Sequence, residues 1–117
     1  MQYLLLLTFP EGAGPQEGTA DYDAEMDRWG ALKDELREAG AYVGASGLRI
    51  GSATTVRSRD GELSITDGPY AETKEVLFSF MIIDAEDLDA AIAWGAKVPS
   101  ARYGSVDIRP MVGLELS

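Results

Sequence analysis

The chain has 117 residues and a formal net charge of −10, from 20 acidic and 10 basic residues, and 45% of its residues are hydrophobic. This length and composition fit one globular domain with its own core, and the acidity disfavours binding to nucleic acids and to anionic membranes. The chain has no Cys and no His, which excludes disulfides and thiolate or imidazole metal ligands and fits a reducing cytoplasm.

A continuous apolar run from Tyr3 to Phe9, interrupted by one Thr, predicts a buried strand. The run follows no basic segment and precedes no cleavage site of small residues, so a strand fits it better than a signal sequence does. Gly and Pro then recur from Pro10 to Gly18 and predict a long surface loop.

A helix is expected from about Asp21 to Ala39, capped by Asp21 or Thr19 and ended by Gly40. Its inner stripe follows spacings of three and four residues and consists of Tyr22, Met26, Trp29, Leu32, Lys33 and Leu36. Gly30 costs about 1 kcal/mol relative to Ala inside a helix, and we expect it to allow close packing of this helix on the sheet.

A second strand is expected over Ala41–Leu48, and a β-hairpin follows it. The hairpin strands are Thr54–Ser58 and Leu63–Thr66, and Asp60-Gly61 gives a strong two-residue turn signal between them. This turn sets a register that pairs Arg59 with Glu62, Ser58 with Leu63 and Val56 with Ile65. We expect the hairpin to project as an arm.

The second half of the chain repeats the pattern of strand, helix and strand. The Asp67–Glu75 loop leads to a buried strand over Val76–Ile83, a helix capped by Asp84 and ended by Pro99, and a last strand over Ser105–Met111. The residues expected to face the core are Leu88, Ala91, Ile92, Gly95 and Val98 in the helix and Val106 and Ile108 in the strand.

Without the hairpin, the order of elements is the split β-α-β arrangement of a ferredoxin-like fold. We therefore predict a single α+β domain over residues 1–117, with an antiparallel sheet, an inserted hairpin and two helices on one sheet face. The runs Tyr3–Phe9 and Val76–Ile83 are apolar at both parities, so the other sheet face is apolar too. Such a face is normally covered by a partner, and we expect a homodimer with sheet packed on sheet.

A family resemblance extends over nearly the whole chain and is strongest in the loop that begins Asp67-Gly68-Pro69-Tyr70. The other segments that carry it are Met1–Leu6, Thr54–Arg57, Asp87–Ala91 and Pro99–Pro110. In these segments the sequence resembles the YCII-related family, and more closely the branch named for an Asp-Gly-Pro-Phe motif. The resemblance implies a ferredoxin-like subunit of the dimeric α/β-barrel type.

The resemblance implies little about activity. Related members are assigned a His–Asp pair as their active site, and this chain cannot complete that pair because it has no His. Tyr70 stands where Phe gives the branch its name, which adds a hydroxyl. Some members occur beside extracytoplasmic-function sigma factors or are fused to them, which implies a regulatory partner.

The Asp67–Glu75 loop holds most of the candidate site residues. Asp67 is the candidate general base, a role that requires burial because an ordinary carboxylate is a weak base at neutral pH. Turn chemistry is the alternative explanation of the same residues, with an Asx turn at Asp67, an unusual φ at Gly68 and a rigid Pro69.

The candidate ligand-binding residues are Tyr70, Lys74 and Arg102. Tyr70 is interpreted either as a hydrogen-bond donor to a ligand or as an apolar plug. If Lys74 and Arg102 converge, they form a cationic spot suited to a small carboxylate. The alternative for both cations is an ordinary surface ion pair, which contributes little to stability.

The sequence contains no EF-hand spacing, no Gly-rich phosphate loop and no dinucleotide fingerprint, so we expect neither a metal nor an organic cofactor. One hypothesis is a cytoplasmic dimer that binds a small molecule, in particular a carboxylate, beside the Asp67–Tyr70 loop, with cofactor-free proton transfer by Asp67. A second is a ligand-binding or partner-binding module without turnover, linked to transcriptional regulation. A third is a purely structural dimer.

Overall fold

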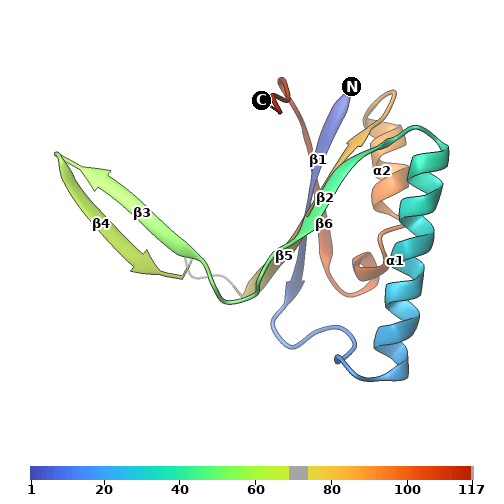
Figure 1. Ribbon diagram of the computed structural model, residues 1–117, viewed down its shortest axis with the longest axis horizontal. Coiled ribbons are helices and arrows are strands. Elements are labelled where there is room, and N and C mark those ends of the chain that lie inside the picture. The colour runs from blue at the N-terminus through green and yellow to red at the C-terminus, as the bar shows by residue number, and fades with distance from the viewer. Residues whose placement is uncertain (69–73, 117) are drawn as a thin grey trace.

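The computed structural model describes residues 1–68 and 74–116 and consists of a sheet layer and a helix layer, from which a hairpin projects (Figure 1). The sheet is antiparallel, with the strand order β2-β5-β1-β6. Its strands are β1 (Gln2–Pro10), β2 (Tyr42–Gly47), β5 (Glu75–Asp84) and β6 (Ser105–Pro110). The helices are α1 (Ala20–Glu38) and α2 (Leu88–Gly95), and a 3₁₀ turn, η1 (Pro99–Arg102), precedes β6.

The first strand is one of the two inner strands of the sheet, because β1 pairs with β5 on one side and with β6 on the other. Along β1, Tyr3, Leu5 and Leu7 are buried, whereas Leu4 and Leu6 between them are partly exposed. Burial therefore alternates with the two-residue period of a strand, because side chains point in turn to the covered and to the open face of the sheet. The predicted mixed α+β class with an antiparallel sheet is confirmed.

Both helices cover the same face of the sheet (Figure 1). The core joins Leu32 and Leu36 of α1 and Ala91 of α2 to the buried residues of the sheet, which are Tyr3, Leu5, Leu7, Met81 and Ile83. The prediction of two helices on one sheet face is therefore confirmed. In the part of the chain that the structure describes, no helix combines the length and the apolar character needed to cross a membrane.

The inner stripe of α1 differs from the prediction in one important position. Met26 is 40% exposed, so its predicted burial is wrong, and Glu25 is buried in its place with 3% exposure. Thr19 caps the helix, as one of the two predicted alternatives. The residues that α1 turns toward the sheet, wholly or partly buried, are therefore Glu25, Trp29, Leu32 and Leu36.

The cap of α2 is Asp87, whose carboxylate accepts a hydrogen bond from the N–H of Ala90 at 2.9 Å. The predicted cap at Asp84 is wrong because Asp84 is still part of β5. Its N–H donates to the carbonyl of Ala41 at 2.8 Å, and its carboxylate accepts a hydrogen bond from the N-terminal amine of Met1 at 3.0 Å. These partners hold Asp84 in the sheet, so the helix begins only at Leu88.

The buried stripe of α2 is narrower than predicted. Leu88 and Ile92 are each 49% exposed, because this short helix faces the sheet with small residues. A Cβ added at Gly95 would lie 3.2 Å from Cδ1 of Ile108, so α2 approaches β6 closely. The close approach predicted at Gly30 is wrong, since Gly30 is exposed and a Cβ there would have no atom within 4 Å.

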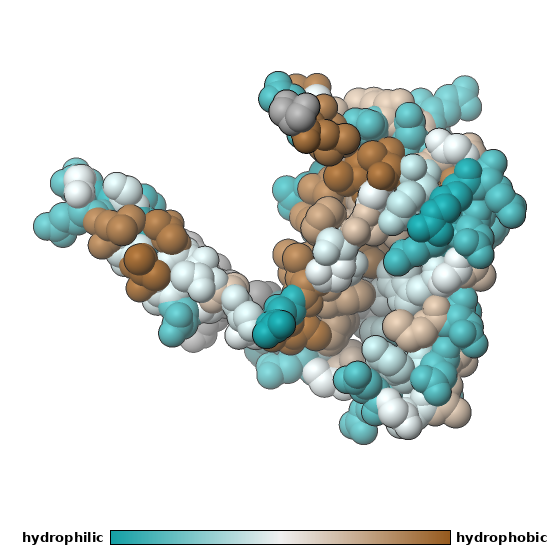
Figure 2. Space-filling model, in the orientation of Figure 1, coloured by the Kyte–Doolittle hydropathy of each residue, from teal (hydrophilic) through white to brown (hydrophobic). Residues whose placement is uncertain are grey.

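The strands β3 (Thr54–Arg59) and β4 (Glu62–Asp67) form the predicted hairpin, and all three predicted residue pairs are confirmed. Asp60 and Gly61 have φ values of 52° and 80°, the positive angles that a tight hairpin turn requires. The hairpin projects from the sheet as an arm, on the side away from the helices (Figure 1). Its side chains of Val56, Leu63 and Ile65 are 63–66% exposed and form an apolar patch (Figure 2).

Candidate functional site

Glu25 is the one acidic residue that is buried among those described, and its side chain is only 5% exposed. Nη2 of Arg102 donates a hydrogen bond to Oε1 of Glu25 at 3.0 Å, and the hydroxyl of Tyr103 donates to Oε2 at 2.7 Å. Each carboxylate oxygen therefore has a donor, as a buried charge requires. These bonds join the first half of α1 to the segment around η1.

The backbone between α2 and β6 fixes the position of Arg102 and Tyr103. The carbonyl of Ser100 accepts hydrogen bonds from the N–H of Tyr103 at 3.2 Å and of Gly104 at 2.8 Å. A Cβ at Gly104 would overlap the carbonyl oxygen of Thr8 in β1, so this close approach requires glycine. The two donors to Glu25 are thus anchored on an inner strand of the sheet.

The ring of Tyr103 packs edge-on against Phe9, with 6.4 Å between ring centroids, and it fills the space that a Cβ of Gly14 would need. Burial raises the pKa of Tyr103 above its usual value of about 10, and the hydrogen bond to the Glu25 carboxylate raises it further. The nearby charge of Arg102 acts in the opposite direction and is the weakest of these effects. Tyr103 is therefore a neutral donor at physiological pH.

We expect Tyr103→Phe to reduce the loss of stability in alkali. The raised pKa means that the folded protein holds this proton more tightly than the unfolded chain does. Its contribution is therefore complete below about pH 10 and is lost as the pH rises through the folded-state pKa. Urea unfolding at several pH values between about 9 and 11 should show a steeper loss for the wild type than for Tyr103→Phe. Equal slopes would contradict the assignment.

A polar pocket of about 440 Å³ opens beside this cluster. It is lined by a loop, by the first turns of α1 and by the end of η1, with the residues Gly14, Pro15, Asp21, Ala24, Arg28, Arg102 and Tyr103. Two guanidinium groups and one carboxylate thus share its wall. The side chain of Arg102 is 56% exposed, so it reaches solvent although it is bonded to Glu25. Among residues 1–68 and 74–116, no group of three or more acidic side chains is placed to hold a metal ion.

The residues predicted to form a site are distributed over separate parts of the structure. Asp67 is exposed at the end of β4, on the arm, and Gly68 has a φ of 90°, in the region that favours glycine. Lys74 is exposed just before β5. The roles predicted for Pro69 and Tyr70 lie outside the described residues.

Of the predicted ligand-binding residues that the structure describes, Arg102 lines the pocket and Lys74 does not. Asp67 does not line it either, and its exposure leaves it without the burial that a general base needs. The role of Asp67 as a base stays a prediction. The pocket that Arg102 lines is formed by α1, by η1 and by the loop at Gly14 and Pro15, and no described residue of the arm lines it.

Glu25 is the site residue that the sequence analysis missed, although the sequence contains a signal for it. Glu25, Trp29, Leu32 and Leu36 follow spacings of four, three and four, so a carboxylate interrupts an otherwise apolar stripe. A charge in such a stripe requires a buried partner. The partners are 77 and 78 residues away, and local patterns do not identify them.

Comparison with known proteins places this architecture in a family. An uncharacterised protein from Rhizobium meliloti (strain 1021) is 40% identical to the chain over 62 residues. This match covers 51% of the chain and 50% of the relative, so the chain matches about half the length of that protein. The YCII-related domain matches residues 1–115. The chain therefore belongs to the YCII-related family.

Proposed function

We propose that the protein binds a small hydroxycarboxylate in the polar pocket beside Arg102. One observation carries the proposal, namely that the buried carboxylate of Glu25 fixes a half-exposed guanidinium at the pocket wall. A guanidinium has five N–H donors in a planar fork, and the bond to Glu25 leaves donors for a ligand carboxylate. Arg28 adds a second cation, and Asp21 offers an acceptor for a ligand hydroxyl.

The cluster of Glu25, Arg102 and Tyr103 is better suited to binding a ligand than to transferring a proton. Both oxygens of Glu25 already accept hydrogen bonds, so Glu25 is not presented to a ligand as a base. The raised pKa of Tyr103 keeps its phenol protonated. A base for cofactor-free chemistry would come from outside this cluster, and Asp67 is the residue that the sequence proposes for it.

Isothermal titration calorimetry with malate tests the proposal. The wild type is expected to bind malate, and Arg102→Gln to weaken binding at least about tenfold, because a charge-assisted bidentate contact is lost. Arg28→Gln is the second variant, since its side chain lies on the exposed part of the wall and is not bonded to Glu25. Arg109→Gln, on β6, is the matched control and should bind as the wild type does. No heat of binding with the wild type, or unchanged affinity in both pocket variants, would overturn the proposal.

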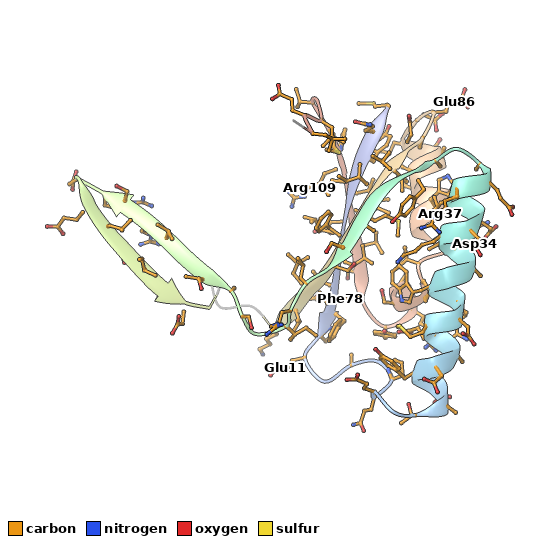
Figure 3. All side chains as sticks on the ribbon, in the orientation of Figure 1. Glu11, Asp34, Arg37, Phe78, Glu86 and Arg109 are labelled. Carbon is orange, nitrogen blue, oxygen red and sulfur yellow. The ribbon has the colours of Figure 1, made fainter. Side chains whose placement is uncertain are left out.

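We also propose that two such subunits form a ferredoxin-like dimeric α/β barrel of the Asp-Gly-Pro-Phe branch. The strand order β2-β5-β1-β6 supports a split β-α-β subunit. Leu4 and Leu6 of β1 lie opposite Ile82 and Phe80 of β5, on the face without helices, and all four are partly exposed (Figure 2). Arg109 points to the same open face (Figure 3). Covering these apolar rows with a second copy removes them from water.

Light scattering is expected to give twice the subunit mass of 12.6 kDa at micromolar concentration. Ile82→Lys places a charge among the apolar rows and should give the monomer, since an unpaired charge is costly to bury. Val112→Lys is the control, because Val112 is fully exposed outside the sheet. A monomeric wild type would refute the dimer.

Partner binding through the arm is a second candidate function, and the apolar patch of Val56, Leu63 and Ile65 favours it. A two-stranded hairpin is marginally stable alone, so a protein that covers this patch would stabilise the arm. Amide hydrogen exchange in β3 and β4 distinguishes the occupants. Slow exchange in the purified homodimer means that a second copy covers the arm. Fast exchange means that the arm is uncovered in the homodimer, so that its apolar patch is open to a different protein.

A further inference from the structure

A second hollow, of about 360 Å³, lies on the helix side of the sheet, between α1 and the strands β2 and β5. It shares no lining residue with the pocket at Arg102. Its volume is at the lower end of the range of about 300–1,000 Å³ found for small-molecule sites. The hollow is therefore large enough for a compact ligand and is independent of the proposed malate site.

The hollow exists because β2 carries small residues where α1 crosses it. Ala45, Ser46 and Gly47 line its floor, and a Cβ added at Gly47 would meet no atom within 4 Å. The side chains of Phe78 and Met81 on β5 complete the sheet side, and Phe78 lies level with the N-terminal half of α1 (Figure 3). Apolar surface thus faces a space that the protein itself leaves unfilled.

The helix side of the hollow is formed by residues of α1 that the sequence places in the inner stripe but that do not enter the core. The expected inner stripe of α1 includes Met26, Trp29 and Lys33, and these three residues line the hollow while Leu32 and Leu36 enter the core. Met26 remains 40% exposed there. Lys33 is partly buried, and in the described part of the chain it makes no ion pair. Lys33 is therefore the one cationic residue among the described residues that line this largely aromatic and aliphatic hollow.

We infer that this hollow binds an apolar monocarboxylate, such as a medium-chain fatty acid, with its hydrocarbon part against Trp29, Phe78 and Met81. The ligand carboxylate pairs with the ammonium group of Lys33. Burial of the chain supplies most of the affinity, and the ion pair supplies the choice of a carboxylate over a neutral head group. Polar hydroxycarboxylates lack the apolar part and belong to the pocket at Arg102.

The test uses the fluorescence of Trp29 in a Trp94→Phe background, in which Trp29 is the single tryptophan of the chain. Octanoate is expected to change the Trp29 emission in a saturable way. Lys33→Met should weaken octanoate binding at least about tenfold while 1-octanol binds both proteins equally, because the alcohol cannot form the ion pair. Gly47→Val should weaken both ligands, since it fills the hollow without meeting another atom at its Cβ.

Methyl NMR of the methionines gives the same answer without the tryptophan variant, because Met26 and Met81 line the hollow and Met1 and Met111 do not. Octanoate should shift the first pair only. Arg102→Gln should leave octanoate binding unchanged, which separates this site from the proposed malate site. Octanoate binding that survives Lys33→Met unchanged, or the absence of saturable binding to the folded wild type, would overturn the inference.

Discussion

Replacing Arg102 with Met is expected to lower the free energy of unfolding by about 2–3 kcal/mol, and replacing Glu25 with Gln by only about 1 kcal/mol. The asymmetry follows from burial, because the side chain of Glu25 is 5% exposed and that of Arg102 is 56% exposed. Without Arg102, a buried negative charge loses its cation and keeps the hydroxyl of Tyr103. Without the charge of Glu25, Arg102 turns to water. Urea unfolding followed by circular dichroism measures both effects.

The double variant of Glu25→Gln and Arg102→Met isolates the pairwise energy. It is expected to be more stable, by about 1 kcal/mol or more, than the sum of the single effects allows, because no buried charge is left unpaired. Lys97→Met is the matched control, since it removes an ion pair to Glu35 of 2.8 Å whose partners are both half-exposed. That variant should lose less than about 1 kcal/mol. Equal losses for Arg102→Met and Lys97→Met would contradict the buried-charge explanation.

The parts of the fold that could be predicted from the sequence are those set by local patterns. The hairpin register follows from the turn at Asp60-Gly61, because positive φ at adjacent residues admits few side chains and fixes which residues face each other. The strand β1 could be predicted because its continuous apolar run is typical of a buried strand. The α2 cap was wrong because Asp84 and Asp87 are both good caps, and the pairing of β5 with β1 decides between them.

The site depends on contacts between distant segments, which local patterns do not contain. The sequence makes Arg102 a candidate and groups it with Lys74 as a cationic spot, whereas the structure pairs it with Glu25 of α1. The orientation of α1 buries Glu25 against Arg102 and leaves Met26 exposed at the hollow beside β2. The polar pocket and the apolar hollow thus lie along the same helix and have no described lining residue in common.

Gly104→Ala is expected to destabilise the protein by about 2 kcal/mol or more, because the added methyl group overlaps the carbonyl oxygen of Thr8 and lies 3.1 Å from Cβ of Phe9. Both neighbours belong to β1, which is paired with a strand on each side, so little can move to relieve the overlap. Thermal and urea unfolding measure the loss. Gly30→Ala is the control and should stabilise by about 0.5–1 kcal/mol, since a Cβ there meets nothing and helix propensity improves.

Gly95→Ala is a comparison variant for Gly104→Ala, because its added Cβ meets the end of a side chain rather than a backbone atom. Its Cβ would lie 3.2 Å from the end of the Ile108 side chain, which can rotate, so a loss below about 1 kcal/mol is expected. Gly104 also carries a functional consequence, because it follows Tyr103 directly and holds η1 against β1. Where Gly104→Ala still folds, the displaced Arg102 should weaken malate binding, whereas Gly95→Ala should leave it unchanged. Unchanged stability and malate affinity in Gly104→Ala would show that β1 does not anchor the pocket.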